Sequence, residues 1–496
     1  MIRALRAALL TLVIGGCAIG PRYHPTEVVP EKTRIGAGGT TGEARAFFDS
    51  LEAARRGDTL ARGDTVPLPR RFVAESLADR AWLDLLKDTT LIRLVQTAVR
   101  QNRDLQVAVA RIREFRAEVG VARGPLFPEI SANASASTNQ AVFGAFPPQK
   151  FDAYQITGDL AWELDFWGRI RRGIEAARAD LGEEEANQRA VLLSLVSDVA
   201  SGYLQLLELD QERAIAQRTL TSRQATLELA RQRFQQGVIS ELDVRQFEAQ
   251  VAVPANTLAQ TERLRSQQEH QLSLLIGEAP TVIPRGGSLA RAVRALEVPD
   301  SIPGSLLERR PDVEAAERAY AAATARVGVA NAARLPTFSI TGYYGTQVPS
   351  TDNLFTSQGE IYQLQGGVSI PLFTGGRLIN EARAARARAE QSRGEYEQTV
   401  LTALREASDA LVAVRTSRDQ VTAQETQASA LRRALQLAEL RYRTGVASYV
   451  EVLDAQRGLF DAELALSQAQ LLQLSSAVEL YRALGGSWQG QGAPAR

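Results

Sequence analysis

The side chains that enzymes use for nucleophilic or metal-assisted catalysis are scarce in this sequence. Two histidines, His24 and His270, and one cysteine, Cys17, occur among 496 residues. A structural zinc site takes four ligands, so these residues cannot build one from Cys and His alone. Neither a dinucleotide-binding nor a P-loop glycine motif lies at a strand-to-helix junction. We therefore expect no enzyme, no cofactor and no metal site. A carboxylate or serine enzyme of the cell surface stays open as an alternative.

The balance of charge gives no indication of an anionic partner. The 57 basic and 57 acidic residues leave a formal net charge of +0. Proteins that bind nucleic acid rely on an excess of positive charge to neutralise phosphates. We expect no nucleic-acid partner.

Cys17 follows an N-terminal secretion signal. Two arginines precede the apolar run AALLTLVI, and the small residues GG come between that run and the cysteine. This pattern predicts a signal peptide over 1–16, and the run is too short to cross a bilayer. The stretch IGGC is similar to a lipobox, in which the cysteine is acylated and becomes the new N-terminus. We expect a lipid-anchored, extended segment over 17–87 that points to the outer membrane, and no transmembrane helix elsewhere.

A long internal repeat organises the rest of the chain. The stretch RFQQGVISELDVRQFEA at 233–249 matches RYRTGVASYVEVLDAQR at 441–457, and further identical residues share the spacing of 208. Such collinearity indicates a tandem duplication. The first structural repeat is expected over 88–303, the second over 304–484, and a disordered tail over 485–496.

Each copy carries two predicted strands. In YQITGDLAWELDF, at 154–166, the even positions are mostly apolar and the odd positions mostly polar. Alternation of this length predicts a strand with one apolar face. If the even positions face lipid, Asp159, Glu163 and Asp165 line a lumen, and we expect a mild preference for cations. A long amphipathic strand behind a signal peptide favours a transmembrane barrel.

The number of strands requires more than one chain. Four strands cannot close a barrel, because the smallest barrels need about eight. Three copies of this chain would supply twelve strands. We therefore expect closure by oligomerisation.

Two very long helices set the scale of each copy. No proline interrupts the residues from Arg169 to about Arg233, or from Arg377 to about Arg441. Roughly 64 residues make a helix of about 95 Å, which cannot pack inside a compact globule. Such helices indicate coiled-coil neighbours arranged as a tube. Shorter helices are expected over 88–123 and 308–333, and Pro254 is expected to bend the returning helix of the first copy.

The repeated stretch is the predicted tip of a helical hairpin. Gly237 and Gly445 permit the chain to reverse, and Ser240 and Ser448 are expected to cap the returning helices.

After the tip the copies diverge. In the second copy Val450, Asp454 and Arg457 lie on one helix face. If that face points at a three-fold axis, three Asp454 side chains converge and repel, and Arg457 can offset them. We interpret this constriction as a gate.

The chain resembles the outer-membrane efflux factors, the TolC-like family, in its lipoprotein branch serving resistance-nodulation-division pumps. The resemblance extends over nearly the whole chain. It rests on CAIGPRYHP (17–25), NRDLQVAVARI (102–112), WELDFWGRIR (162–171), LLERRPDVEAAE (306–317), SIPLFTGGR (369–377), RYRTG and VLDAQR within 441–457, and LYRALGG (480–486).

The resemblance implies a mixed, mostly α fold. Three chains would form a twelve-stranded transmembrane β-barrel, four strands from each, continuous with a long periplasmic α-helical coiled-coil barrel. The homotrimer would be the passive exit duct of a tripartite efflux system in the outer membrane of a Gram-negative-type bacterium. Its partners would be a periplasmic adaptor protein and an inner-membrane pump, which would supply the energy.

The resemblance also implies roles for single residues. The periplasmic gate falls on the positions of Val450, Glu451, Asp454 and Arg457, and the inter-helix lock on those of Asp243 and Tyr442. Where some members place an arginine in the lock, this chain has Ala447. The adaptor would meet the tips at Gly237, Ser240, Gly445 and Ser448.

One alternative shares several of these features. A periplasmic lipoprotein adaptor of an efflux or secretion system also has a lipobox and a helical hairpin. Such adaptors usually have a single hairpin and lipoyl-like domains. The duplication and the paired amphipathic strands argue for the duct.

Overall fold

The computed structural model describes residues 19–21, 23, 34–36, 39–40, 88–141, 148–294, 301–303, 309–444, 446 and 448–486. The signal peptide, Cys17, most of the segment over 17–87, Gly445 and residues 487–496 lie outside the described residues. The described chain divides into two compact units. One contains Ala110–Ala186 and Glu314–Gln398, and the other contains Asn187–Val313 and most of the chain after Thr399. Each unit therefore takes segments from both sequence repeats.

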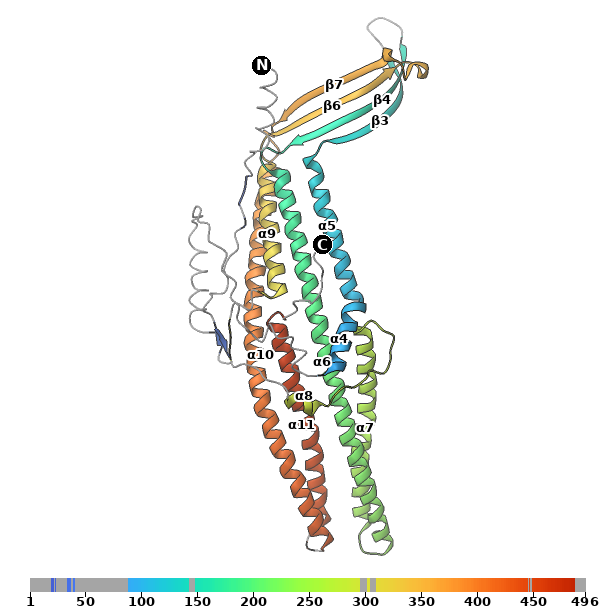
Figure 1. Ribbon diagram of the computed structural model, residues 1–496, viewed down its shortest axis with the longest axis vertical. Coiled ribbons are helices and arrows are strands. Elements are labelled where there is room, and N and C mark those ends of the chain that lie inside the picture. The colour runs from blue at the N-terminus through green and yellow to red at the C-terminus, as the bar shows by residue number, and fades with distance from the viewer. Residues whose placement is uncertain are drawn as a thin grey trace. The chain divides into compact units, whose positions relative to one another are not determined.

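The first unit contains a four-stranded antiparallel sheet, visible as four adjacent arrows in Figure 1. The strand order is β3-β4-β6-β7, so β3 and β7 form its two edges. Two long strands per sequence copy were expected, and the structure has them. Their bounds are β3 Glu129–Ala141, β4 Gln149–Leu164, β6 Thr337–Val348 and β7 Glu360–Ser369.

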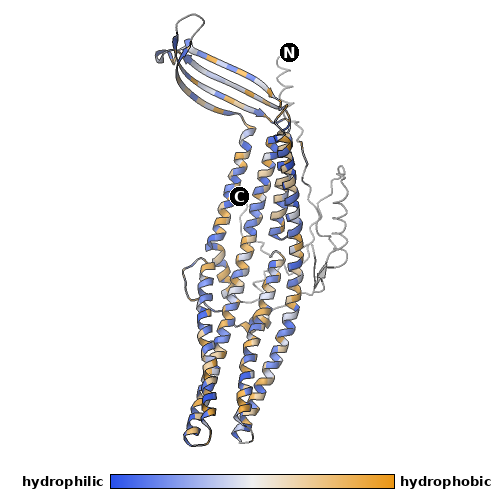
Figure 2. Cartoon of the chain, turned by 180° about the vertical axis from the view of Figure 1, so that it is seen from behind, coloured by the Kyte–Doolittle hydropathy of each residue, from blue (hydrophilic) through white to orange (hydrophobic). Residues whose placement is uncertain are grey.

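The register of the sheet separates polar from apolar side chains. Asp159 of β4 lies opposite Ser131 of β3 and Tyr343 of β6, and Leu160 lies opposite Ile130. Directly opposed residues point to the same face of a sheet, so polar odd positions of β4 share a face with polar neighbours. Hydrophilic and hydrophobic colours alternate along the strands in Figure 2. The predicted alternation is thus maintained across neighbouring strands.

Most helices recur at the spacing of the sequence repeat. Helix α6 begins at Arg169 and α10 at Arg377, 208 residues later, and each has 67 residues. Helices α7 and α11 follow the tips and have 35 residues each. The helices are α4 Thr89–Gln101, α5 Arg103–Arg123, α6 Arg169–Gln235, α7 Glu241–Leu275, α8 Leu289–Arg294, α9 Pro311–Ala332, α10 Arg377–Arg443 and α11 Tyr449–Ala483. A small sheet of β1 (Arg34–Gly36), β2 (Gly39–Thr40) and β5 (Ser301–Pro303) belongs to the second unit.

One predicted helix is two helices in the structure. The continuous helix expected over 88–123 is interrupted at Asn102, whose ψ of 132° is not helical. The Oδ1 atom of Asn102 accepts a hydrogen bond from Leu105 N at 3.0 Å, and its Nδ2 donates to Leu275 O at 3.0 Å. Asn102 therefore caps the start of α5 while binding the end of α7, and this replaces the helical bonds lost at the break. Pro254 lies inside α7, which continues through that residue as one helix.

The core of the second unit is a cluster of apolar side chains from α4, α6, α7, α8 and α11. Leu91, Val196, Leu204, Leu272 and Leu474 are each almost fully buried in it. By length and composition alone, α6 has one window that could cross a membrane, and 56% of that window is buried. Most of the α6 residues from Leu195 to Leu207 belong to this cluster. Packing in the core therefore accounts for the apolar character of this part of α6.

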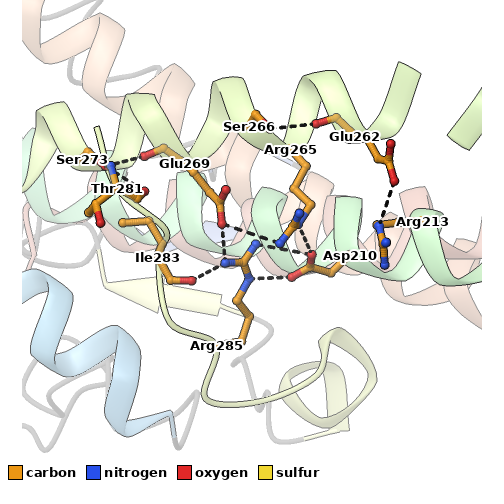
Figure 3. Close-up of polar contacts among 10 residues, drawn as sticks. All are labelled: Asp210, Arg213, Glu262, Arg265, Ser266, Glu269, Ser273, Thr281, Ile283 and Arg285. Atoms are coloured by element: carbon orange, nitrogen blue, oxygen red, sulfur yellow. Dashed lines mark hydrogen bonds and ion pairs between the residues drawn. The ribbon is translucent and has the colours of Figure 1, made fainter. Parts of the chain in front are cut away.

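An ion-pair network fixes the segment that follows α7, as Figure 3 shows. Arg285 donates to Asp210 Oδ2 at 2.7 Å and to Glu269 Oε1 at 2.5 Å. Arg265 donates to Asp210 Oδ1 at 2.8 Å. Two guanidinium groups thus face two carboxylates from α6 and α7, and the charges balance. Such charge-assisted bonds hold the loop against both helices.

Next to this network the loop passes the start of α4 so closely that there is no room for a side chain at Gly286. Gly286 N donates to Tyr203 Oη at 2.8 Å, and Tyr203 Oη donates to Asp88 Oδ2 at 2.9 Å. Asp88 in turn caps α4 by accepting from Thr90 N. A Cβ atom on Gly286 would lie 2.3 Å from Asp88 Oδ1.

We predict that Gly286→Ala destabilises the second unit. The methyl group must displace the capping carboxylate of Asp88, and such overpacking costs about 1–3 kcal/mol. The midpoint of denaturant unfolding of the detergent-solubilised protein should therefore fall. Gly173→Ala is the matched control, because a Cβ there meets nothing within 4 Å and alanine favours helix. Equal midpoints for the two variants would contradict the assigned crossing.

Candidate functional site

The first helical hairpin reverses at Gly237, as predicted. Gly237 has a φ of +73°, a left-handed conformation that costs glycine little. Its N donates to Phe234 O, and Val238 N donates to Arg233 O, each at 2.9 Å. These bonds satisfy carbonyl groups at the end of α6, as a glycine C-cap does.

Ser240 begins the returning helix by a reciprocal cap. Its Oγ accepts from Asp243 N at 3.3 Å, and Asp243 Oδ2 accepts from Ser240 N at 2.9 Å. The predicted N-cap is therefore present as a capping box. The carboxylate of Asp243, predicted to take part in an inter-helix lock, is used within its own helix turn.

The second tip differs from the first. Ser448 occupies the N-cap position of α11 but its side chain makes no capping hydrogen bond, contrary to our expectation. Glu451, which stands where Asp243 stands in the first copy, instead forms an ion pair with Arg441, Nε to Oε2 at 3.4 Å. The partner needed for a capping box is thus drawn to α10. Gly445 and Ala447 lie outside the described residues.

The predicted gate residues share the exposed face of α11. Val450 is 63% exposed, and Asp454 and Arg457 are also exposed, whereas Val452 and Phe460 on the other face are buried. This arrangement agrees with the predicted helix periodicity. Beside the gate residues lies a groove of about 410 Å³ between α10 and α11. It is lined by Leu431, Ala434, Ala438, Glu451, Asp454, Ala455, Arg457, Gly458 and Asp461.

The groove is acidic with a small-residue floor. Glu451, Asp454 and Asp461 contribute three carboxylates, and Arg457 contributes one guanidinium. Alanine and glycine keep the floor low, and a Cβ on Gly458 would lie 3.4 Å from Leu431. A second helix surface could approach α11 closely here.

Tyr442, the other predicted lock residue, contacts an arginine of the first hairpin. Arg233 of α6 donates a hydrogen bond to Tyr442 Oη, and its guanidinium carbon lies 5.2 Å from the centroid of the tyrosine ring. The two predicted lock residues therefore have separate partners: Tyr442 binds Arg233, and Asp243 binds Ser240. Within one chain, Arg233 provides one of the contacts between the hairpins.

Three aromatic rings continue this contact across the tips. Tyr442 meets Tyr449 edge-on with ring centroids 5.2 Å apart, and Tyr449 lies 4.0 Å from Phe247. Burial raises the pKa of the Tyr449 phenol above its ordinary value, so it stays neutral. Together Arg233, Tyr442, Tyr449 and Phe247 link helices α6, α10, α11 and α7. We call these four residues the tip cluster.

A second arginine joins the hairpins and was not predicted. Arg223 of α6 is only 3% exposed, and it donates to Gln250 O at 2.8 Å and to Gln456 O at 3.5 Å. Its guanidinium carbon lies 5.3 Å from the ring centroid of Phe460. Burial lowers the pKa of Arg223, but carbonyl oxygens and the ring face support its charge.

Differences between the copies could have revealed these residues. Arg223 corresponds to Leu431, Phe247 to Ala455 and Tyr449 to Glu241 at the spacing of 208. In each of these pairs the two residues differ in size or in charge. Such substitutions within a repeated frame mark positions where the two hairpins make different contacts.

The carboxylates predicted to line a lumen have three different surroundings. Asp159 lies on the polar face of β4 and accepts from Asn133 Nδ2 at 2.6 Å and from Thr157 Oγ1 at 3.1 Å. Glu163 is held by both nitrogens of an arginine fork, Arg169 Nε at 3.0 Å and Nη2 at 2.6 Å. Its charge is therefore balanced locally.

Asp165 is not a strand residue, which corrects the sequence prediction. β4 ends at Leu164, and the Asp165 carboxylate accepts from Ile170 N at 3.1 Å and Arg171 N at 2.9 Å. It also accepts from Arg171 Nε at 3.2 Å. Asp165 thus satisfies free N–H groups at the start of α6, where a negative charge is favoured.

Known proteins resemble the chain along almost its whole length. The family model described as "Outer membrane efflux protein" matches residues 94–278 and again 302–486. The "Antibiotic efflux pump outer membrane protein ArpC" of Pseudomonas putida is 32% identical over 497 residues, covering 98% of this chain and 96% of that protein. The "Solvent efflux pump outer membrane protein SrpC" of the same species is 33% identical over 485 residues, covering 96% and 97%.

A solved structure agrees with the fold. The outer-membrane channel OprN superposes with a TM-score of 0.76 at 31% identity, covering 86% of this chain and 100% of that chain.

We predict that Tyr442→Ala loosens the tips. It removes a cation–π contact and an aromatic pair, together worth about 1–2 kcal/mol. Backbone amides of residues 231–244 should exchange hydrogen about tenfold faster, since local opening follows the lost free energy. Tyr442→Phe keeps the ring and should give a smaller change. Unchanged exchange in Tyr442→Ala would show that the tip cluster does not join the hairpins.

Proposed function

Because this chain belongs to the outer membrane efflux protein family, we propose that it is the passive exit duct of a tripartite efflux system. The observation that carries the proposal is the match of the family model to both halves of the chain. The combination of an amphipathic four-stranded sheet with two 67-residue helices in one chain supports it. The names of ArpC and SrpC differ in cargo, antibiotic and solvent.

The duct would be a homotrimer. Strands β3 and β7 are the edges of the described sheet, and backbone groups inside a bilayer need hydrogen-bond partners. Four strands cannot close on themselves, whereas three chains bring twelve strands, enough for a barrel. In this proposal β7 of one chain pairs with β3 of the next. The helices α6, α7, α10 and α11 of the three chains would form the periplasmic coiled-coil barrel.

An internal duplication would give the trimer its pseudo-sixfold helical part. The equal lengths of α6 and α10, the equal lengths of α7 and α11, and the spacing of 208 between both pairs support this. The two family matches begin at 94 and 302, again 208 residues apart.

The partners would be a periplasmic adaptor and an inner-membrane pump of the resistance-nodulation-division type. The adaptor would meet the hairpin tips around Gly237, Ser240, Gly445 and Ser448. The pump would supply the energy, since the duct has no nucleotide-binding motif of its own. Acylation at Cys17 would anchor the chain in the outer membrane.

The closed state would depend on the exposed face of α11. Val450, Glu451, Asp454 and Arg457 of three chains would surround the axis as an iris. The acidic groove beside Asp454 supports this, because converging carboxylates form a barrier that small helix movements can change. The tip cluster, with Tyr442 bound to Arg233, would hold α10 and α11 against α6 and α7. Asp243 would act indirectly by fixing the start of α7.

We predict that Asp454→Ala opens the duct. Trimers checked by gel electrophoresis would be inserted into planar bilayers, and the native protein should conduct poorly. Removal of three converging carboxylates should raise conductance or the frequency of opening severalfold. Asp419→Ala, an exposed acid on α10, is the matched control and should leave conductance unchanged.

The other outcomes separate the duct from the gate. A native channel that conducts well and is unchanged by Asp454→Ala would remove the gate assignment and keep the duct. Folded, inserted protein with no conductance in any variant would remove the duct and favour the adaptor function.

We predict a mild preference for cations that depends on Asp159. Of the three carboxylates first considered, Asp159 lacks an arginine partner in its described contacts, whereas Glu163 and Asp165 have one each. Reversal potentials in a salt gradient should shift toward zero in Asp159→Asn. Arg169→Gln should strengthen the preference, because it frees the Glu163 carboxylate. A preference for anions in the native channel would contradict the lumen assignment.

A further inference from the structure

A carboxyl group is buried where α6 packs against α11. Glu208 is only 4% exposed, and its Oε1 atom has no hydrogen-bond partner among the described residues. Its neighbours along α6 include Leu204, Leu206 and Leu207, which belong to the apolar core. An ionised carboxylate in such surroundings costs far more free energy than a protonated one.

The carboxyl group of Glu212 lies one helical turn away and faces Glu208. The two are spaced i, i+4, which places their side chains on one face of the helix. Two carboxyl groups can share a hydrogen bond only if one of them carries a proton. Burial and the neighbouring Glu212 raise the pKa of Glu208 to about 8.

The surrounding helices offer no opposite charge to Glu208 within the described residues. On the α11 side its neighbour is Ser467, which is neutral and fully buried. The acid of α11 nearest along the chain, Glu463, is paired with Arg218 and Arg432. On α7, Arg265 and Glu269 bind Asp210 and Arg285. The arginines named here are therefore each bound to other carboxylates.

We propose that Glu208 is a proton-operated switch in the packing of α6 against α11. With its proton, Glu208 shares a hydrogen bond with Glu212 and the helices pack closely. When the proton leaves to solvent, two carboxylates face each other on successive turns inside the interface. Repulsion and the need for hydration then separate the helices at this point.

The position of the switch connects it to the hairpins. The contacts that follow along α6 and α11 are the Gln211–Gln470 hydrogen bond at 3.1 Å and the Arg218–Glu463 ion pair at 2.6 Å. The same α11 carries Asp454 and Arg457 near its start. Alkaline pH would therefore favour movement of α11. This consequence for conduction rests on the proposed function, whereas the protonation of Glu208 does not.

The pH dependence of stability has a defined sign. The folded protein binds the Glu208 proton more tightly than the unfolded chain does, so unfolding releases a proton and becomes easier as pH rises. The stabilisation is complete below the ordinary pKa of 4.5, falls as pH rises, and is lost above about 8. Ionisation in the folded protein occurs near the upper value.

The test compares unfolding midpoints of the full-length protein in detergent from about pH 5 to about pH 9. Glu208→Gln keeps the shape and neutrality of the protonated acid. It should match the native protein near the lower pH and exceed its midpoint by several degrees near the upper pH. Glu228→Gln makes the same change at an exposed site of α6 and should follow the native profile. Parallel profiles for native protein and Glu208→Gln would overturn the proposal.

A second variant keeps the test decisive if Glu208→Gln folds poorly. Glu212→Gln removes the like charge and adds a donor, so the Glu208 ionisation should move to lower pH. Hydrogen exchange of the α6 and α11 amides should follow that shift, and an unmoved transition would also overturn the proposal. Conductance of the same proteins separates the two claims. A missing pH effect in a conducting channel removes the switch alone, and a pH effect without conductance removes the duct alone.

Discussion

Hydrogen bonding of the strand backbone is the constraint on which the rest of this molecule depends. A sheet of four strands has two edges, and an unpaired edge cannot lie in hydrocarbon. If the sheet spans a membrane, β3 and β7 must pair with strands of other chains. The number of chains that close the barrel then also fixes the number of helices in the assembly. The polar face assembled from β3, β4, β6 and β7 then becomes an interior surface. In the proposed duct, a single amphipathic strand pattern would thus lead to the oligomer, to the lumen and to the set of helices that pack side by side.

The long helices are stabilised by lateral contacts along their whole length and not by a single core. Near the loop network the contacts are apolar, with Leu204, Leu272 and Leu474 almost fully buried. Toward the tips the apolar clusters are smaller, such as that of Leu227, Val244 and Phe247. Polar and ring contacts accompany them there: Gln211 with Gln470, Arg223 with Phe460, and Arg233 with Tyr442. Polar and ring contacts depend more on orientation than apolar packing does, and each contributes little alone. The contacts between the hairpins therefore depend more on side-chain orientation near the tips than near the loop network.

Features that depend on periodicity were predicted from the sequence, whereas features that depend on the contacts of single side chains were missed. Strand positions and the two long helices follow from alternation and from uninterrupted helix-forming runs, and β4 and α6 lie within a few residues of the expected bounds. The break at Asn102 was missed because its side chain binds Leu275 O, 173 residues away. Asp165 was placed on a strand because it continues the alternation, although its carboxylate caps the next helix. The capping box of Ser240 was partly foreseen, but the absence of a cap at Ser448 depends on Arg441, which competes for Glu451. Among the four residues of the tip cluster, only Tyr442 was predicted. Its partner Arg233 was missed because it belongs to the other copy.

The divergence of the two copies indicates where function is concentrated. Helices α6 and α10 have equal lengths and so present equivalent backbone positions twice, yet their side chains differ at the contacts described above. Glu208 corresponds to Thr416, Arg223 to Leu431, and Glu163 to Pro371. If these positions only had to maintain the backbone conformation, the residue found in one copy would serve equally well in the other. At these three positions the first copy has a buried acid, a buried arginine and a paired carboxylate where the second copy has uncharged residues, whereas the exposed Asp454 and Arg457 occur in the second copy. Arg223 and Arg233 of the first copy contact Phe460 and Tyr442 of the second, so the hairpins are joined by contacts between the two copies.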